Sequence, residues 1–354
     1  MHAYPCYFAS LANLLLDYGI VHMKIGVLGA GTWGFCLASL LASKGHHTIS
    51  WTRDPQLAKQ LTSTREHPNL PGHCAPGHML FTTNLAEALT DIDLLVESVT
   101  SAGLRPVFEK VKQLLIPSCP IVLTSKGIEQ NSGLILPMVV IEVFGDQIKS
   151  QIAFLSGPSY AEEVIQGLPT SVVVSAYDPQ LMLNIAETFT TRTFRVYPNS
   201  DLHGVCYGGA LKNIIAIACG IADGLGMGFS AKAALMTRGL HEIRKLAVAQ
   251  GCKPETLYGL SGMGDLCVTC NSLVSRNCRF GYLMAQGMTP QEAQKKIGMV
   301  VEGAYTCLSA LQLSKQLDIQ MPITETIYHI LYEGMQPKDA VQKLMDRAVK
   351  EEHL

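Results

Sequence analysis

The feature that most constrains the fold of this chain is a group of three glycines near its beginning. The mostly apolar run 25–28 leads directly into Gly29, Gly31 and Gly34, which have GxGxxG spacing and are followed by a helical pattern. In a turn from strand to helix, the first glycine permits the tight turn, the second lets the backbone approach a phosphate, and the third lets helix and strand pack closely. The free N–H groups at the helix start then attract an anion. This context predicts a dinucleotide site in preference to an ordinary glycine turn.

The rest of the first half of the chain alternates short apolar runs with helical stretches, which is typical of a parallel sheet wrapped by helices. After about residue 201 the pattern becomes helical, with long segments rich in alanine, leucine and isoleucine. We therefore expect an α/β fold in which a Rossmann-like dinucleotide-binding domain over 23–203 is followed by an all-helical substrate domain over 204–354. The apolar runs lie at 24–28, 48–51, 94–98, 121–124, 152–155, 171–175 and 194–197.

Residues 1–22 precede this pattern and are apolar enough to suggest a secretory signal. No lysine or arginine precedes their apolar stretch, as a signal requires, and the stretch is too short and interrupted to span a membrane. We expect Met23 to be the functional start and residues 1–22 to be an upstream extension outside the fold. A native N-terminus before Met23, found by mass spectrometry, would contradict this.

The composition favours work on small molecules. Only 16% of the residues are charged and the formal net charge is -2, so no broad field points to nucleic acid or to an anionic membrane surface. Eleven cysteines, scattered without the spacing of a disulfide framework, are typical of a reducing compartment, and we expect a cytoplasmic protein. Cys267 and Cys270 form a lone CxxC pair, which indicates ordinary packing in preference to zinc or redox chemistry, and we expect no metal site.

The residues after the second expected strand bear on the kind of dinucleotide. An acidic residue there usually binds the ribose hydroxyl of NAD, whereas an arginine accommodates the additional phosphate of NADP. Arg53 comes first and Asp54 follows it. An arginine can stack on adenine and pair with a phosphate, so we favour NADP and keep NAD as the alternative. A solvated turn is the plain structural explanation of the same residues.

Polar or glycine-containing segments follow three of the expected strands, at 98–101, 125–127 and 156–159. Ligands of open α/β sheets bind beyond these carboxyl ends. Lys126 ends a strictly apolar strand, so we expect its side chain to face a ligand. Each segment alone fits a solvated loop equally well, but their coincidence at strand ends favours function.

One lysine of the helical half lies in unusually small surroundings. Lys212 has Gly208, Gly209 and Ala216 on its face of the expected helix, so another group can approach it closely. A buried lysine without a partner is costly. A functional lysine therefore competes with a structural one whose ammonium group reaches the surface.

Two further segments of the helical half fit anion binding. Asp265 follows a glycine loop, and Ser275, Arg276 and Asn277 open a later helix. Hydroxyl, amide and guanidinium groups beside the free N–H groups of a helix start form a phosphate-type site. A capped surface helix would look the same, and Glu302, at the start of another helix, fits a solvated cap.

Taken together, these motifs closely resemble the NAD(P)-dependent glycerol-3-phosphate dehydrogenases of the bacterial type. The resemblance runs from Met23 to about Arg347 and has no counterpart for residues 1–22. The motifs that carry it are GAGTWG at 29–34, SKGIE at 125–129, SGPSYAEEV at 156–164, GGALKNIIAIACG at 208–220, GMGDL at 262–266, SRNCRFG at 275–281, VVEG at 300–303 and MPITETIY at 321–328.

The resemblance implies a role for each matching residue. Lys212 is the expected proton acceptor, with Lys126 and Asp265 beside it in catalysis. It also implies a homodimer and a reaction that feeds phospholipid synthesis. The expected dinucleotide contacts are Gly29, Gly31, Thr32, Trp33, Gly34, Arg53, Lys126, Ala161, Arg276, Val300 and Glu302. The expected substrate contacts are Lys126, Gly157, Ser159, Lys212, Asp265, Ser275, Arg276 and Asn277.

The implied reaction interconverts glycerol 3-phosphate and dihydroxyacetone phosphate. A hydride passes between the C2 carbon of the substrate and a nicotinamide dinucleotide. A lysine that accepts the hydroxyl proton must lose its own proton, and lowering its pKa to about 7 to 8 corresponds to roughly 4 kcal/mol. Burial and Lys126 lower this pKa, whereas Asp265 raises it. A β-hydroxyacid dehydrogenase, or a nicotinamide-binding sensor without activity, stays as an alternative.

Overall fold

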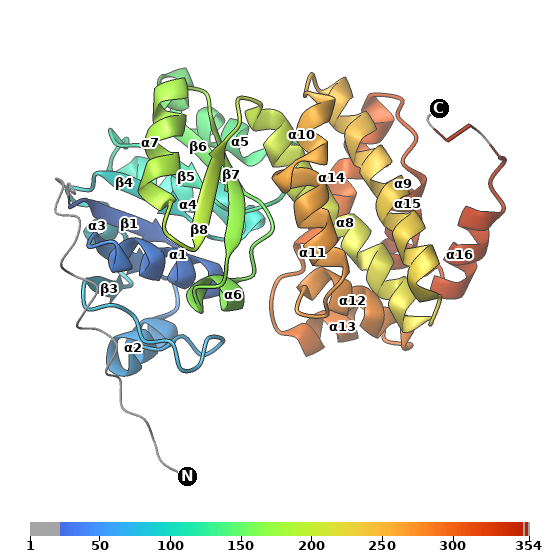
Figure 1. Cartoon of the computed structure of the whole chain (residues 1–354), viewed down its shortest axis with the longest axis horizontal. Helices are drawn as coiled ribbons and strands as arrows, with labels where there is room; N and C mark the ends of the chain where they lie inside the picture. The colour runs from blue at the N-terminus through green and yellow to red at the C-terminus, as the bar shows by residue number, and fades with distance from the viewer. Residues whose placement is uncertain (1–21, 350, 353–354) are drawn as a thin grey trace, which may run out of the picture.

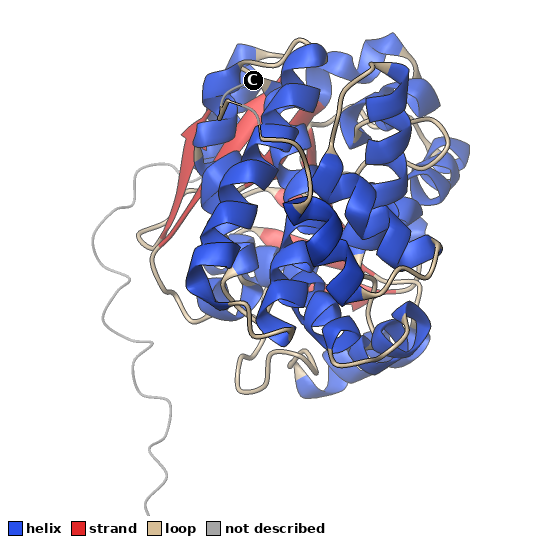
Figure 2. Cartoon of the chain, turned by 90° about the vertical axis from the view of Figure 1, so that its right-hand side faces the viewer, coloured by secondary structure: helices blue, strands red, loops and turns tan. Residues whose placement is uncertain are grey.

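The computed structural model describes residues 22–349 and 351–352. Of the predicted N-terminal extension, only His22 belongs to the described residues. Figure 1 shows a sheet with its helices on one side of the molecule and a group of helices on the other. Figure 2, turned so that the helical side faces the viewer, shows helices in front and strands behind them. The predicted fold class, an α/β domain followed by an all-helical domain, is confirmed.

The first domain is built on one sheet of eight strands in the order β3-β2-β1-β4-β5-β6-β7-β8. The first six strands in chain order are parallel to one another, and the chain order reverses between β1 and β4. A crevice forms at such a reversal, outside the carboxyl ends of the strands. The strands are β1 Lys24–Leu28, β2 His47–Trp51, β3 Met79–Thr82, β4 Leu94–Glu97, β5 Ile121–Leu123, β6 Ile152–Ser156, β7 Thr170–Ala176 and β8 Phe194–Pro198.

Two features of the sheet differ from the sequence expectation. The edge strand β3 was not predicted, because it has only four residues and two of them are not buried. The sheet is also not purely parallel, since β7 runs antiparallel to β6 and β8 then runs parallel to β7. Apolar patterning reports which residues are buried but not the direction of a strand, so this reversal was not visible in the sequence.

Helices cover both faces of the sheet, which explains why its central strands are continuous apolar runs. Asp54, Asn84 and Asp178 each cap a helix through a side-chain oxygen that accepts backbone N–H bonds. The helices of this domain are α1 Thr32–Ser43, α2 Pro55–Thr64, α3 Leu85–Leu89, α4 Ser101–Leu114, α5 Leu136–Phe144, the 3₁₀ turn Asp146–Gln151, α6 Ala161–Ile165 and α7 Pro179–Phe189.

The second domain consists of helices arranged around α8. Its helices are α8 Leu202–Gly224, α9 Gly228–Ala249, α10 Pro254–Tyr258, the π turn Leu260–Gly264, α11 Asp265–Cys270, α12 Arg276–Ala285, α13 Pro290–Ile297, α14 Glu302–Gln316, α15 Pro322–Tyr332 and α16 Pro337–Met345. The expected division at residues 203 and 204 stays a proposal, and it falls just after the start of α8.

The central helix α8 is apolar around its whole circumference because other helices surround it. It is long and apolar enough to cross a membrane, but its apolar window is entirely buried within the protein. The backbones of α8 and α12 are in direct contact. A Cβ placed on Gly220 would lie 1.9 Å from the carbonyl oxygen of Cys278, and one on Gly281 would lie 2.0 Å from that of Ile217. The two helices therefore touch with no side chain between them.

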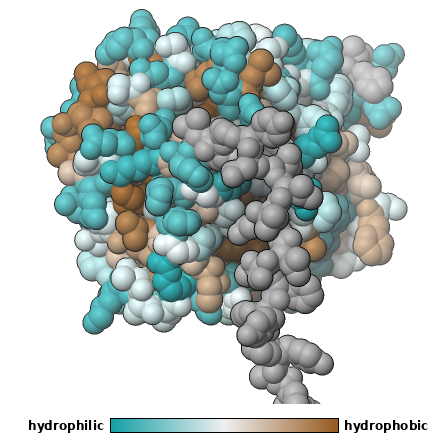
Figure 3. Space-filling view, turned by 60° about the vertical axis from the view of Figure 1, so that its left-hand side comes forward, coloured by the Kyte–Doolittle hydropathy of each residue, from teal (hydrophilic) through white to brown (hydrophobic). Residues whose placement is uncertain are grey.

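The outer surface of the sheet domain is mixed in character. Figure 3 shows hydrophilic side chains interspersed with small apolar groups on the face that it presents. Single exposed apolar side chains are normal on globular proteins.

Candidate active site

The glycine turn after β1 has the geometry that its spacing predicts. Gly29 has a φ of 106°, and a Cβ on it would lie 2.4 Å from the carbonyl oxygen of Ser98. A Cβ on Gly34 would lie 1.9 Å from the carbonyl oxygen of Gly29, whereas nothing lies within 4 Å of one on Gly31. Gly31 is also the N-cap of α1 and supplies no side-chain cap. The start of α1 therefore presents uncapped N–H groups toward open space, as an anion site requires.

The structure shows what each of the two residues after β2, Arg53 and Asp54, is free to bind. Asp54 caps α2, and its Oδ1 accepts the N–H groups of Gln56 at 2.9 Å and Leu57 at 3.3 Å. Arg53 is exposed beside it. Since the carboxylate is engaged in the cap, Arg53 is the side chain of this pair that can turn toward a ligand.

Between the domains, two lysines share one buried carboxylate. The Nζ of Lys212 on α8 donates to Oδ1 of Asp265 at 2.5 Å, and the Nζ of Lys126, after β5, donates to Oδ2 at 2.6 Å. Asp265 is 1% exposed and Lys212 is 6% exposed. Lys126 also donates to the carbonyl oxygen of Gly157 at 3.1 Å. The three charged groups thus join the ends of β5 and β6 to α8 and α11.

The surroundings of Lys212 shift its proton equilibrium. Burial lowers the pKa of Lys212 to about 8, Asp265 opposes this shift, and the positive charge of Lys126 adds to it. The sequence left open whether burial or Asp265 dominates, and in the structure burial does. A lysine with this pKa exchanges its proton near neutral pH, which suits an acid–base group.

Glycines on α8 make room for this cluster. A Cβ on Gly209 would lie 2.6 Å from Oγ of Ser156 and 3.6 Å from Cδ of Lys126. A Cβ on Gly208 would lie 2.8 Å from the carbonyl oxygen of Ser261. The small residues around Lys212 therefore allow Lys126 and the Ser261 backbone to pack directly against α8.

Lys212 has a second partner that the sequence reasoning missed. Its Nζ donates to Oγ1 of Thr269 at 2.6 Å, and this hydroxyl also lies 2.6 Å from the carbonyl oxygen of Asp265. Thr269 stands four residues after Asp265 on α11, and side chains with this spacing share one helix face. That spacing was the available signal, and it places carboxylate and hydroxyl together against the lysine.

The start of α12 lies close to the same region of α8. Ser275 caps α12 through the N–H of Cys278 at 3.3 Å, and Arg276 donates to the carbonyl oxygen of Val300 at 3.0 Å. Asn277 is buried, where it donates to Oδ1 of Asn213 at 3.0 Å. Its own Oδ1 accepts the N–H of Gly303 at 2.9 Å. Asn277 thus joins α8, α12 and α14, while Arg276 is exposed beside it.

The remaining expected residues surround these groups. Oε1 of Glu302 accepts the N–H of Ser101 at 3.1 Å, and the Ser101 hydroxyl donates to Oε2. Glu302 thus caps α4 across the domain boundary, so it is not the solvated cap that the sequence also allowed. Ser159 donates to the carbonyl oxygen of Gly157 at 3.1 Å. Ala161 starts α6, while Thr32 and Trp33 start α1, and Thr32 accepts a bond from Asn69 at 3.1 Å.

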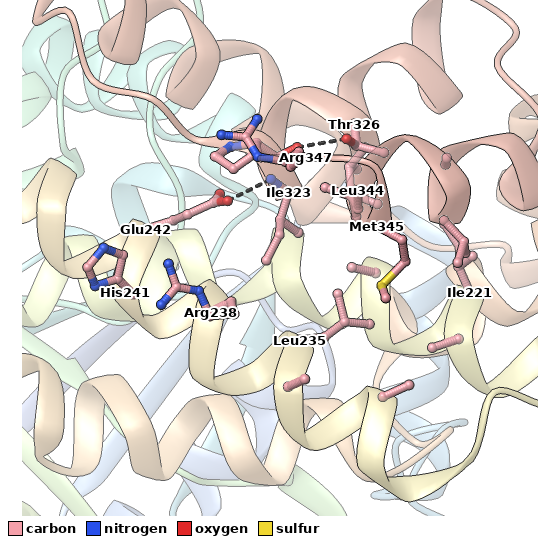
Figure 4. Close-up of a pocket in the computed structure, with 18 of the residues that line it drawn as sticks. Ile221, Leu235, Arg238, His241, Glu242, Ile323, Thr326, Leu344, Met345 and Arg347 are labelled. Atoms are coloured by element: carbon pink, nitrogen blue, oxygen red, sulfur yellow. Dashed lines mark hydrogen bonds between the residues drawn. The ribbon is translucent and has the colours of Figure 1, made fainter. Parts of the chain in front are cut away.

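A separate cavity of about 560 Å³ lies on the far part of the helical domain, between α8, α9, α15 and α16. Figure 4 shows the Glu242 side chain pointing toward the start of α15 at one end of it, where its carboxylate accepts the N–H of Ile323 at 2.6 Å. None of the expected site residues lines this cavity. Among the described residues, no group of three or more histidine, cysteine or carboxylate side chains could hold a metal ion.

A glycine turn open to a pyrophosphate in one domain, together with a buried lysine between the two domains whose pKa is lowered to about 8, is typical of dinucleotide-dependent oxidoreductases. Comparison with known families names the family within this class. Residues 24–182 match the family model described as NAD-dependent glycerol-3-phosphate dehydrogenase N-terminus, and residues 201–342 match the corresponding C-terminus. The chain belongs to this family, so the resemblance noted in the sequence is confirmed.

Relatives agree over almost the whole chain. A protein of Protochlamydia amoebophila named glycerol-3-phosphate dehydrogenase (NAD(P)+) is 66% identical over 94% of this chain and 99% of its own length. One of Chlamydia pneumoniae with the same name is 57% identical over 93% and 99%. The solved glycerol-3-phosphate dehydrogenase of Coxiella burnetii aligns with a TM-score of 0.88 at 36% identity, covering 92% of this chain and 99% of that one.

Proposed function

We propose that this protein interconverts glycerol 3-phosphate and dihydroxyacetone phosphate with a nicotinamide dinucleotide as the second substrate. The observation that carries the proposal is that buried Lys212 and half-buried Lys126 share the buried carboxylate of Asp265 between the two domains. Membership of the family and the names of the relatives supply the identity of the substrate pair.

The residues fit a dinucleotide. The open space at Gly31, the uncapped start of α1 and the exposed Arg53 provide room and partners for a pyrophosphate and an adenosine phosphate. When bound, the dinucleotide supplies the hydride acceptor or donor. We assign its contacts to Gly29, Gly31, Thr32, Trp33, Gly34, Arg53, Lys126, Ala161, Arg276, Val300 and Glu302.

In this mechanism Lys212 moves the proton. In the oxidative direction its neutral amine accepts the proton of the C2 hydroxyl, and in the reductive direction its ammonium returns that proton to the developing alkoxide. Asp265 and Thr269 hold the Nζ atom in place through bonds of 2.5 and 2.6 Å. Lys126 contributes a positive charge beside the reacting oxygen, where it stabilises negative charge.

We assign the phosphate of the substrate to the start of α12. This helix has ten residues, and Ser275 and Arg276 place a hydroxyl and a guanidinium beside its first N–H groups. Asn277 fixes α12 against α8 and α14 through its two bonds, so that it stabilises the anchor. Gly157 and Ser159 border the site from the end of β6 through the Gly157 carbonyl that Lys126 contacts.

We further propose a preference for NADP over NAD, supported by the use of Asp54 as a helix cap and by the exposure of Arg53. The test compares kcat/KM for NADPH and NADH in the wild type and in Arg53→Ala. The variant should lose efficiency mainly with NADPH, and an unchanged ratio of the two efficiencies would exclude the role of Arg53.

The test of the whole function is oxidation of NADPH in the presence of dihydroxyacetone phosphate, repeated with NADH. Steady turnover excludes a sensor without activity. A screen that includes β-keto acids separates this function from that of a β-hydroxyacid dehydrogenase. A cytoplasmic location, a homodimer and a contribution to phospholipid synthesis complete the proposal, and fractionation and analytical ultracentrifugation test the first two.

A further inference from the structure

Glu97, the last residue of β4, is a buried carboxylate that none of the expected roles uses. It is 0% exposed. Its Oε1 accepts the backbone N–H of Val99 at 2.8 Å and the hydroxyl of Ser125 at 2.6 Å. Its Oε2 lies 3.4 Å from the N–H of Thr124. All three donors are neutral, and a buried carboxylate held only by neutral donors is expensive to maintain. What Glu97 contributes therefore depends on the loops to which its donors belong.

The donors belong to two loops that border the active site. Val99 lies in the loop between β4 and α4, whose Ser98 carbonyl packs against Gly29 of the dinucleotide turn. The same loop leads to Ser101, which binds Glu302 from the helical domain. Oε1 of Glu97 therefore holds the loop whose backbone packs against Gly29 of the dinucleotide turn.

The other loop carries the catalytic cluster. Ser125 immediately precedes Lys126, whose Nζ must reach Asp265 at 2.6 Å. The strands themselves end just before this point, since the paired residues of β4 and β5 stop at Glu97 and Leu123. Beyond the ladder, the Glu97 carboxylate supplements the backbone bond from Thr124 to the Glu97 carbonyl at 3.0 Å.

We propose that Glu97 is a positioning residue, which fixes the loop after β4 against the loop after β5 so that Lys126 and the dinucleotide turn keep their relative places. This inference rests on the proposed function, because it assigns Glu97 a part in that reaction. Glu97 acts through Ser125 and Val99 and touches neither reacting atom.

The hydrogen-bond chemistry of Ser125 supports this role. Its single hydroxyl proton has two acceptors within reach, Oε1 of Glu97 and the carbonyl oxygen of Val99. An ionised Glu97 accepts the hydrogen bond that the Ser125 hydroxyl donates. A protonated Glu97 can donate to Ser125, which then donates to Val99. Burial raises the pKa of Glu97 to about 7, and the link between the loops persists in both protonation states.

The variants that test the proposal differ in whether residue 97 can still accept these hydrogen bonds. Glu97→Gln keeps a carbonyl oxygen that can accept from Val99 and Ser125, whereas Glu97→Ala removes it. Ser125→Ala breaks the link from the other loop. The matched control is Glu242→Ala, since Glu242 is also a buried glutamate held by neutral donors, with a pKa raised to about 7, but it lies on the distant cavity.

We expect Glu97→Ala to lower kcat/KM for dihydroxyacetone phosphate by about 10- to 100-fold, because displacing Lys126 by a fraction of an ångström misaligns the reacting groups. It should also raise the Kd of NADPH, measured by fluorescence titration. Glu97→Gln should restore most of both. Ser125→Ala should lower kcat/KM, and the double variant Glu97→Ala with Ser125→Ala should be no worse than Glu97→Ala alone, because the two residues act in one link.

Glu242→Ala should lower Tm and leave kcat/KM close to wild type. Wild-type kcat/KM in Glu97→Ala, or strictly additive effects of the two substitutions, would overturn the proposal. So would a loss of efficiency in Glu242→Ala equal to that in Glu97→Ala. If Glu97→Ala does not fold, Ser125→Ala and Glu97→Gln still decide, since the first must lose efficiency and the second must keep it. Absence of wild-type turnover would refute the proposed function, while the NADPH titrations would still test the link.

Discussion

Replacing Asp265 by asparagine gives the sharpest test of how the site controls its proton. Asp265 lies between two ammonium groups, 2.5 Å from that of Lys212 and 2.6 Å from that of Lys126. Asparagine keeps the shape and removes the negative charge. With the two charge centres taken as about 4 Å apart and an effective dielectric constant of about 20, the pair is worth about 4 kcal/mol, which corresponds to about three pKa units. The pKa of Lys212, about 8 in the wild type, should therefore fall in Asp265→Asn, because the negative charge that opposes the effect of burial is removed.

The assay is kcat/KM for glycerol 3-phosphate at saturating dinucleotide, measured against pH. Oxidation needs the neutral amine, so the wild-type profile rises with pH up to the pKa of Lys212 and then levels. In Asp265→Asn the rising part should move to lower pH by about three units. Asp223→Asn, which removes the partner of Lys232 at 2.6 Å in the same domain, should leave the profile in place.

A second substitution should shift the pKa of Lys212 in the opposite direction. Lys126 lowers the pKa of Lys212, so Lys126→Met should move the rising part to higher pH, even though its overall efficiency falls. This variant also decides the question if Asp265→Asn is too unstable to purify, because losing one partner of a buried ion pair costs about 3–5 kcal/mol. A rising part at the same pH in all variants would refute Lys212 as the titrating group.

Three further predictions test the remaining roles. Lys212→Ala should abolish most of kcat and leave NADPH affinity intact, and a variant that keeps most of its kcat would exclude Lys212 as the base. Arg276→Ala should chiefly raise KM for the phosphorylated substrate, with a smaller effect on the dinucleotide, since a phosphate contact is largely uniform binding; an unchanged KM would contradict this. Burial raises the pKa of Glu242 from 4.5 to about 7, so the folded state holds this proton more tightly, and stability falls between about pH 4.5 and 7 by roughly 3 kcal/mol. Urea unfolding at pH 5 and pH 7 should show a smaller fall in Glu242→Gln, and an equal fall would refute this cause.

The sequence was most informative where a residue type has a single physical use. Gly29 and Gly34 were expected to allow a tight turn and close packing, and the atoms that a Cβ would strike are present at both positions. The helical half was visible because its apolar residues recur with helical spacing. The direction of β7 was not visible, because a run of buried residues has the same pattern in either direction of a strand.

The site could be predicted only in part, since it depends on contacts between distant segments. The family resemblance implied that Lys126, Lys212 and Asp265 act together, but the fact that both lysines bind the same carboxylate became visible only in the structure, because the three residues come from separate segments. Glu302 was expected to contact the dinucleotide, but only the structure shows that it binds Ser101. Glu97 lies within the apolar run 94–98, and no feature of the sequence set it apart.

The backbone contact between α8 and α12 has a consequence for substrate length. In the proposed function Lys212 on α8 must reach the C2 hydroxyl while the start of α12 holds the phosphate. At Gly220 and Gly281 the two helices touch without intervening side chains, so no change of rotamer can widen or shorten the span between them. We therefore expect a substrate with one more methylene group to reach only one of these two groups, which a comparison of kcat/KM for the two substrates would test. Redesign for longer sugar phosphates should accordingly begin at these glycines, away from every group that touches the substrate.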